Sequence, residues 1–119
     1  MLSETELLTK LYKCFNARNV DGALATLHPD VAWDNDLEGG YVHGHAGVRE
    51  YWQRWWEAID THAEPIDHSV GTDGAVNVKV RLTARDASGN LAYDNIGHHI
   101  FRFENGLIKH FEVRTRSDV

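Results

Sequence analysis

Two ionisable residues in the C-terminal part of this chain, His99 and Glu112, have the types and spacing of a general acid–base pair. They lie in two alternating segments that flank an Asn-Gly dipeptide at 105–106, a strong signal for a tight hairpin turn because both residues tolerate positive φ. Counting outward from a two-residue turn places His99 opposite Glu112, and Phe101 opposite His110, on one face. A carboxylate beside an imidazole fixes its tautomer and raises its pKa, which favours proton transfer near neutral pH. The sequence therefore predicts His99, oriented by Glu112, as a catalytic residue. The alternative is a half-buried histidine that satisfies a hydrogen bond between strands.

Two further residues offer suitable chemistry, Asp34 and Tyr12. Asp34 follows Trp33, and burial beside an indole ring would raise the pKa of its carboxyl group and make it a base; the alternative is an aspartate that caps a loop. Tyr12 can donate a phenolic hydrogen bond to a carbonyl or an oxyanion; the alternative is a helix tyrosine whose ring lies in the core. Trp33, Trp52 and Phe101 are predicted to hold the apolar body of a ligand.

The histidines do not have the spacing of a metal site. Neighbouring strand residues point to opposite faces, so His98 and His99 cannot readily share one ion. His43 and His45 lie in a Gly-flanked loop, where exposure is expected. The sequence predicts no metal and no cofactor. The single cysteine, Cys14, excludes an internal disulfide and is typical of a reducing compartment.

Length and composition exclude several classes of function. A chain of 119 residues, 42% apolar and 25% charged, is typical of one globular domain, predicted here over 1–119. A net charge of −6 without any Lys/Arg cluster argues against a nucleic-acid or anionic-membrane partner. No apolar run approaches the roughly 18 residues of a membrane span, and the opening Met-Leu-Ser-Glu is too acidic for a signal peptide. The prediction is a cytoplasmic protein.

The elements that must position these residues are visible in the periodicity of the chain. Apolar residues recur at helical spacing in the first half, and the period changes to two in the second half. The predicted helices cover 4–18, 22–27 and 45–59, and the predicted strands cover 31–33, 66–70, 76–85, 92–104 and 107–116. Asp21 is predicted to cap the second helix, and Trp55 and Trp56 in the third are assigned to packing. This order predicts an α+β fold with the helices on one face of a curved, mostly antiparallel sheet.

Three segments, 16–33, 44–52 and 101–108, together resemble the nuclear transport factor two-like (SnoaL-like) superfamily. The resemblance covers essentially the whole chain in the right order. It implies a cone-shaped α+β barrel in which three N-terminal helices pack on the curved sheet, with a deep pocket between them. It also implies a homodimer formed through the outer face of the sheet. This superfamily includes isomerases, dehydratases, cyclases, epoxide hydrolases and members without catalysis.

The steroid isomerase branch of this superfamily gives the nearest catalytic template, which combines a tyrosine, a carboxylate base and a protonated carboxylic acid. Counting from the shared segments places its tyrosine at Leu11, its base at Asn35 and its acid at His99, so none of the three residue types matches. A shift of one residue would recover Tyr12 and Asp34. Dehydratases of the same fold resemble this chain in using pocket histidines together with Tyr and Asp.

The sequence therefore predicts a protein that binds a small, partly apolar organic molecule in its barrel. Cofactor-free acid–base chemistry of the isomerase, dehydratase or cyclase type would follow. The alternative is a non-catalytic ligand-binding or dimerisation module of the same fold. An inward-facing, buried His99 with Asp34 across a closed cavity would favour the enzyme, and a filled or open cavity would favour the module.

Overall fold

The computed structural model of the chain describes residues 2–36 and 38–115. Six strands form one curved sheet in the order β2-β1-β6-β5-β4-β3. The elements in chain order are α1 (Glu4–Asn16), α2 (Val20–Leu24), β1 (Leu27–Asp34), β2 (Tyr41–His43), α3 (Gly44–Ala58), β3 (Asp60–Val70), β4 (Val76–Arg85), β5 (Leu91–Glu104) and β6 (Leu107–Thr115). Neighbouring strands are antiparallel except β1 and β6, which are parallel. The predicted α+β fold with a mostly antiparallel sheet is confirmed.

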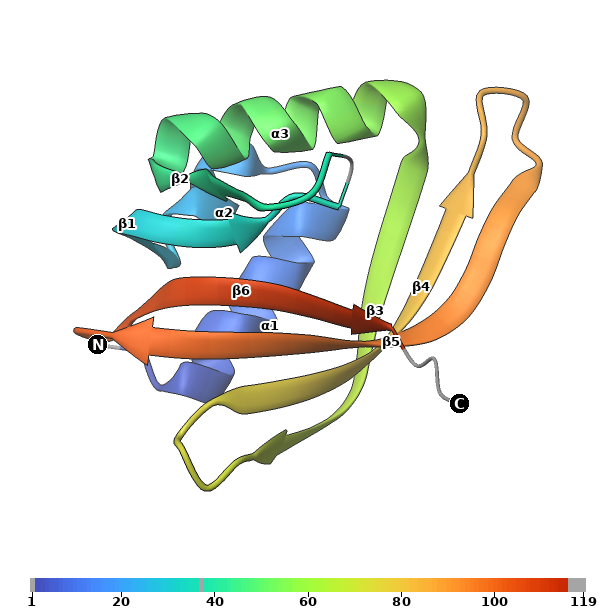
Figure 1. The fold of residues 1–119 in the computed structure, drawn as a ribbon. Coiled ribbons are helices and arrows are strands. Elements are labelled where there is room, and N and C mark those ends of the chain that lie inside the picture. Colours follow the sequence, from blue (N-terminus) through green and yellow to red (C-terminus); the bar gives the residue numbers. More distant parts are fainter. Residues whose placement is uncertain (1, 37, 116–119) are drawn as a thin grey trace.

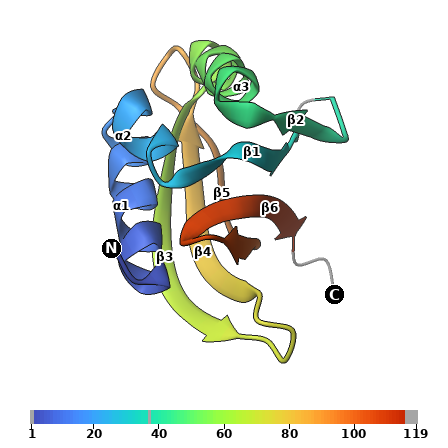
Figure 2. The ribbon, with the colours of Figure 1, turned by 90° about the vertical axis from the view of Figure 1, so that its left-hand side faces the viewer.

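The three helices cover one face of the sheet. In Figure 1, α3 runs across β1 and β2, and α1 lies behind the β5–β6 hairpin. Figure 2 shows α1 beside β3 and the strong bend of β3 and β4 along their length. Trp52 of α3, Phe101 of β5 and Ile108 of β6 are almost completely buried where these layers meet. No helix in the described part of the chain is long and apolar enough to cross a membrane.

The N-terminal segment forms two helices and then a strand that is longer than predicted. At the start of α1, Ser3 and Glu6 form a capping box in which each side chain accepts a hydrogen bond from the backbone N–H of the other. The second helix is displaced from the predicted 22–27, because its cap is Asn19, whose Oδ1 accepts from the N–H of Gly22 at 3.0 Å, and not Asp21. The segment 27–34 is extended because it pairs with β6 on one side and β2 on the other.

The β5–β6 hairpin departs from the predicted register three residues after its turn. Phe103 pairs with Ile108, as a two-residue turn requires, but Arg102 pairs with His110. Lys109 is therefore the extra residue of a β-bulge, which shifts every later pair by one position. As a result, Phe101 lies opposite Phe111 and His99 lies opposite Val113.

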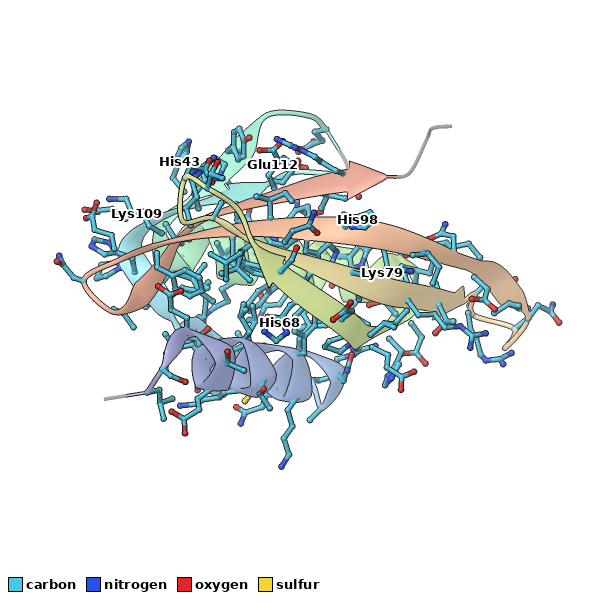
Figure 3. All side chains as sticks on the ribbon, turned by 90° about the horizontal axis from the view of Figure 1, so that it is seen from below. His43, His68, Lys79, His98, Lys109 and Glu112 are labelled. Atoms are coloured by element: carbon cyan, nitrogen blue, oxygen red, sulfur yellow. The ribbon has the colours of Figure 1, made fainter. Side chains whose placement is uncertain are left out.

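This shift corrects the predicted position of Glu112. Glu112 pairs with Ile100, so it lies on the outer face of the sheet and cannot orient His99. Its carboxylate instead accepts from Nε of Arg114 at 3.0 Å. The last predicted residue of this strand, Arg116, lies outside the described residues. Figure 3 shows Glu112 together with His98 and Lys79. His98 of β5 and Lys79 of β4 are paired neighbours on the same outer face.

Candidate active site

A cavity of about 100 Å³ lies between the helices and the concave face of the sheet. Its walls come from α1, α3 and the strands β1, β3, β4, β5 and β6. The predicted site residues that line it are Tyr12, Trp33, Asp34, Trp52, His99 and Phe101. Residues that line it without having been predicted include Phe15, Asp36, Tyr51, Trp55, Thr61 and Tyr93.

Tyr12 and His99 form a buried hydrogen-bonded pair at this cavity. The Tyr12 hydroxyl lies 2.6 Å from Nδ1 of His99, and the two rings are parallel, with their centroids 5.9 Å apart. Only 6% of Tyr12 and 7% of His99 is exposed. The pair exists because α1 presents Tyr12 to the concave face, and the alternation of β5 points His99 inward between Gly97 and Phe101.

Burial decides the charge state of this pair. Removal from water lowers the pKa of His99 to about 3, and the neighbouring His98 contributes to this lowering. This corrects the expected rise in the pKa of His99, which depended on Glu112. Burial also raises the pKa of Tyr12 well above its usual range. Both rings are therefore neutral at pH 7, and the imidazole offers its second nitrogen as a neutral donor or acceptor, according to its tautomer.

Two carboxylates, Asp34 and Asp36, line the same cavity. Asp34 ends β1, where its Oδ2 accepts a hydrogen bond from the N–H of Val113 at 2.9 Å. Burial raises the pKa of Asp36, and the negative charge of Asp34 raises it further. The hydroxyl of Tyr51 accepts from the N–H of Asp36 at 3.0 Å. Burial is also the main cause that raises the pKa of Tyr51 to about 12.

Aromatic rings form most of the remaining wall. Trp33 stacks on Phe111 with the centroids 3.9 Å apart, and Trp52 meets Trp33 edge-on at 5.2 Å. Trp55 also lines the cavity, which corrects its assignment to packing. Trp56 does not line it: its ring packs on Phe15, with the centroids 5.2 Å apart.

Sequence reasoning missed Asp36, the carboxylate of the cavity whose pKa burial raises, and the signal for it was weak. Asp36 lies two residues after Asp34, between the predicted strand 31–33 and the predicted helix 45–59. Only the packing of α3 brings Tyr51 and Trp55 to that segment. Within residues 2–36 and 38–115, no group of three or more His, Cys, Asp or Glu residues is arranged to hold a metal ion.

The chain belongs to the SnoaL-like domain family, whose family model matches residues 8–111. Structures of the nuclear transport factor two-like type share the fold over nearly the whole chain. One such protein of unknown function, from Burkholderia pseudomallei, is 25% identical, with a TM-score of 0.84 over 98% of this chain and 92% of its own. No match was found among curated proteins.

Two further similar structures carry more specific descriptions. A candidate polyketide cyclase from Xanthomonas campestris is 24% identical, with a TM-score of 0.76 over 94% of this chain and 89% of its own. A Mycobacterium tuberculosis protein, solved in complex with estradiol-17β-hemisuccinate, is 16% identical, with a TM-score of 0.81 over 94% of this chain and 92% of its own. At these identities the likeness establishes the fold alone.

Proposed function

We propose that this protein binds a small, largely apolar organic molecule in the cavity and catalyses cofactor-free proton transfer on it. The observation that carries the proposal is the buried, neutral Tyr12–His99 pair at the wall of an aromatic cavity that also holds two carboxylates. Candidate polyketide cyclases and a steroid-ester complex among the similar structures support a ligand of this kind.

The proposed roles follow from the charge states of the groups. The Tyr12–His99 pair hydrogen-bonds an oxygen of the ligand and stabilises negative charge that develops there, because a neutral donor in a dry site interacts strongly with an oxyanion. Asp36, whose pKa is raised, is a stronger base than an ordinary aspartate and takes a proton from carbon or oxygen. Asp34 supports this step through its charge. Trp33, Trp52 and Phe101 contact the apolar body of the ligand.

The non-catalytic alternative is favoured by one specific observation. Asp34 already accepts a backbone hydrogen bond from Val113, so at least one of its oxygens has a structural task. A ligand-binding module would use the same cavity and the same Tyr12–His99 pair without moving a proton. The two functions therefore share the binding step and differ in the chemical step.

The binding step is tested with 1-naphthol and naphthalene, which differ by one hydroxyl. Wild-type protein should bind 1-naphthol about tenfold more tightly, since a hydrogen bond in a buried site contributes roughly 1 to 1.5 kcal/mol. Tyr12→Phe should lose that advantage, whereas Tyr41→Phe, at an exposed tyrosine outside the cavity, should keep it. Equal affinities of the wild-type protein for 1-naphthol and naphthalene would contradict the proposed hydrogen bond between Tyr12 and an oxygen of the ligand.

The chemical step is tested by deuterium exchange at the carbon next to the carbonyl of 2-tetralone, followed by NMR in D₂O. Wild-type protein should accelerate the exchange above the rate of a protein-free blank. Both Asp36→Asn and Tyr12→Phe should slow the exchange by about 100-fold, the usual contribution of a general base or an oxyanion donor. Exchange at the blank rate, with 1-naphthol still bound, would leave the non-catalytic module as the function.

A further inference from the structure

The carboxylates of the cavity wall are not balanced by a lysine or arginine in the described part of the chain. Asp34 and Asp36 both line it, and no lysine or arginine does among the described residues. Two of the histidines that the structure describes line the cavity: the buried His99, which is neutral at pH 7 because its pKa is about 3, and the exposed His62 of β3. Arg54, on the same helix as Trp55, is paired with Glu38 at 3.4 Å and is not a lining residue. A ligand in the cavity therefore meets two carboxylates and, from residues 2–36 and 38–115, no lysine or arginine.

Aromatic rings gather at the same part of the wall as these carboxylates. Tyr51 and Tyr93 line the cavity together with Asp36. Burial raises the pKa of both tyrosines, and the charge of Asp36 adds to this rise. The hydroxyl of Tyr51 accepts from the N–H of Asp36. Tyr51 and Trp55 lie one turn apart on α3 with nearly parallel rings, 6.4 Å between centroids. The faces of aromatic rings carry partial negative charge, so they attract cations.

Two buried polar atoms of the cavity wall have no hydrogen-bond partner among the described residues. In the described part of the chain, Nε1 of Trp52 and Oγ1 of Thr61 have no hydrogen-bond partner, although both residues are more than nine-tenths buried. Both residues line the cavity. Buried polar groups are rarely left unpaired, because each costs free energy until it finds a partner. A ligand that pairs with either atom would offset this cost.

We propose that the cavity selects organic cations, with an amine or quaternary ammonium group held by Asp34, Asp36 and the rings of Tyr51, Tyr93 and Trp55, and the apolar body held deeper. This inference rests on the proposed function, because it uses the same cavity, and it names the substrate class. An ammonium group beside two carboxylates removes their mutual repulsion, whereas a carboxylate or phosphate ligand adds to it. Anionic ligands are therefore disfavoured.

Three probes of similar shape and different charge test this selection: benzyltrimethylammonium, its uncharged carbon isostere neopentylbenzene, and the anion phenylacetate. Affinities are measured by isothermal titration calorimetry or by quenching of tryptophan fluorescence at pH 7.5 and low salt. We expect the cation to bind about tenfold more tightly than the isostere, the combined effect of carboxylate and ring attraction. We expect phenylacetate to bind most weakly.

Matched variants separate local attraction from net charge. Asp36→Asn should reduce the advantage of the cation over the isostere by about three- to tenfold, with little change in the affinity of the isostere. Asp30→Asn removes the same charge from an exposed position on the same strand as Asp34 and outside the cavity, so it should keep the advantage. Circular dichroism verifies that both variants are folded.

The outcomes distinguish this inference from the function on which it rests. Cation selection is wrong if neopentylbenzene binds as tightly as benzyltrimethylammonium. It is also wrong if Asp36→Asn leaves the difference between these two affinities unchanged. In either case the proposal that the cavity binds a ligand is unaffected. Tightest binding of phenylacetate would overturn the inference in the same way. If none of the three probes binds and 1-naphthol does not bind either, both proposals fall.

Discussion

At the scale of single residues, burial affects the protonation of His99 and Tyr12 more than neighbouring charged residues do. His99 has no acidic neighbour in its ladder, and Val113 lies across from it in place of Glu112. The low pKa that follows makes the imidazole a neutral hydrogen-bonding group and removes it as a proton carrier near pH 7. The phenol of Tyr12 is kept neutral by the same burial, which raises its pKa. In the proposed reaction, proton transfer therefore falls to the carboxylates.

The low pKa of His99 predicts acid sensitivity of the fold. The pKa of histidine is near 6.5 in the unfolded chain and about 3 for His99 in the folded protein. Between these two pH values the unfolded state binds one proton more than the folded state. The free energy of unfolding therefore falls as the pH falls. Between pH 7 and pH 5 this group should cost about 2 kcal/mol of the free energy of unfolding. The measurement is urea denaturation at several pH values.

The variant His99→Gln identifies the group responsible. It should lower stability at pH 7, because it disturbs the hydrogen bond to Tyr12, but it should show a shallower loss between pH 7 and pH 5. The matched control is His68→Gln, at an exposed position on β3. A pH dependence in His99→Gln as steep as that of the wild-type protein would contradict the assignment.

At the scale of elements, the bulge at Lys109 decides which side chains of β6 face the cavity. Without it, Phe111 and Val113 would alternate to the outer face, and His110 and Glu112 would point inward. The bulge therefore gives an apolar wall. In this wall, Phe111 stacks on Trp33, and the backbone N–H of Val113 donates a hydrogen bond to the carboxylate of Asp34. Both contacts join β6 to β1, which are parallel neighbours in the sheet.

Single-residue deletions test this account of the register. Deleting Lys109 removes only the extra residue, so His99 should stay opposite Val113 and the loss of stability should be below about 2 kcal/mol. Deleting Glu112 instead turns Val113 outward and places Arg114 at the cavity, which should cost more than about 4 kcal/mol. The measurement is chemical denaturation, with cross-strand NOEs to assign the pairs. Equal losses in the two variants would show that Lys109 is not the extra residue.

At the scale of the whole molecule, the two faces of the sheet differ in character. The concave face is apolar and aromatic around the cavity, and the outer face carries polar and charged side chains such as Lys79, His98 and Glu112 (Figure 3). Arg81 and Asp94 form a two-point ion pair on this outer face, at 3.0 and 2.7 Å. Such a surface suits a partner that presents complementary charges.

The expected homodimer through this outer face stays a prediction. If two copies associate through this charged face, ion pairs between them contribute to the contact, and salt weakens such pairs. Light scattering after size exclusion should then give twice the chain mass of 13.5 kDa, with dissociation at high ionic strength. A mass of 13.5 kDa at all protein concentrations would contradict the prediction.

The sequence by itself determined the architecture. The change of apolar period from helical spacing to two predicted the order of the elements except β2, which was not predicted, and β3 begins six residues before its predicted start. The Asn-Gly turn correctly placed Phe103 opposite Ile108. The shared segments indicated the SnoaL-like family, which the family model confirms over residues 8–111. Periodicity sufficed here because the spacing of apolar residues follows from the geometry of each helix or strand by itself.

Only the tertiary structure decided the site. In the sequence the bulge at Lys109 shows only as a spacing of three between the apolar residues Ile108 and Phe111, which a count by twos from the turn does not detect. The bulge moves Glu112 away from His99. The hydrogen bond between Tyr12 and His99 joins residues 87 positions apart, and the raised pKa of Asp36 arises from burial in a cavity that α3 completes. Register, desolvation and long-range contact depend on how elements pack, so the pairing and charge of the site residues could not be read along the chain.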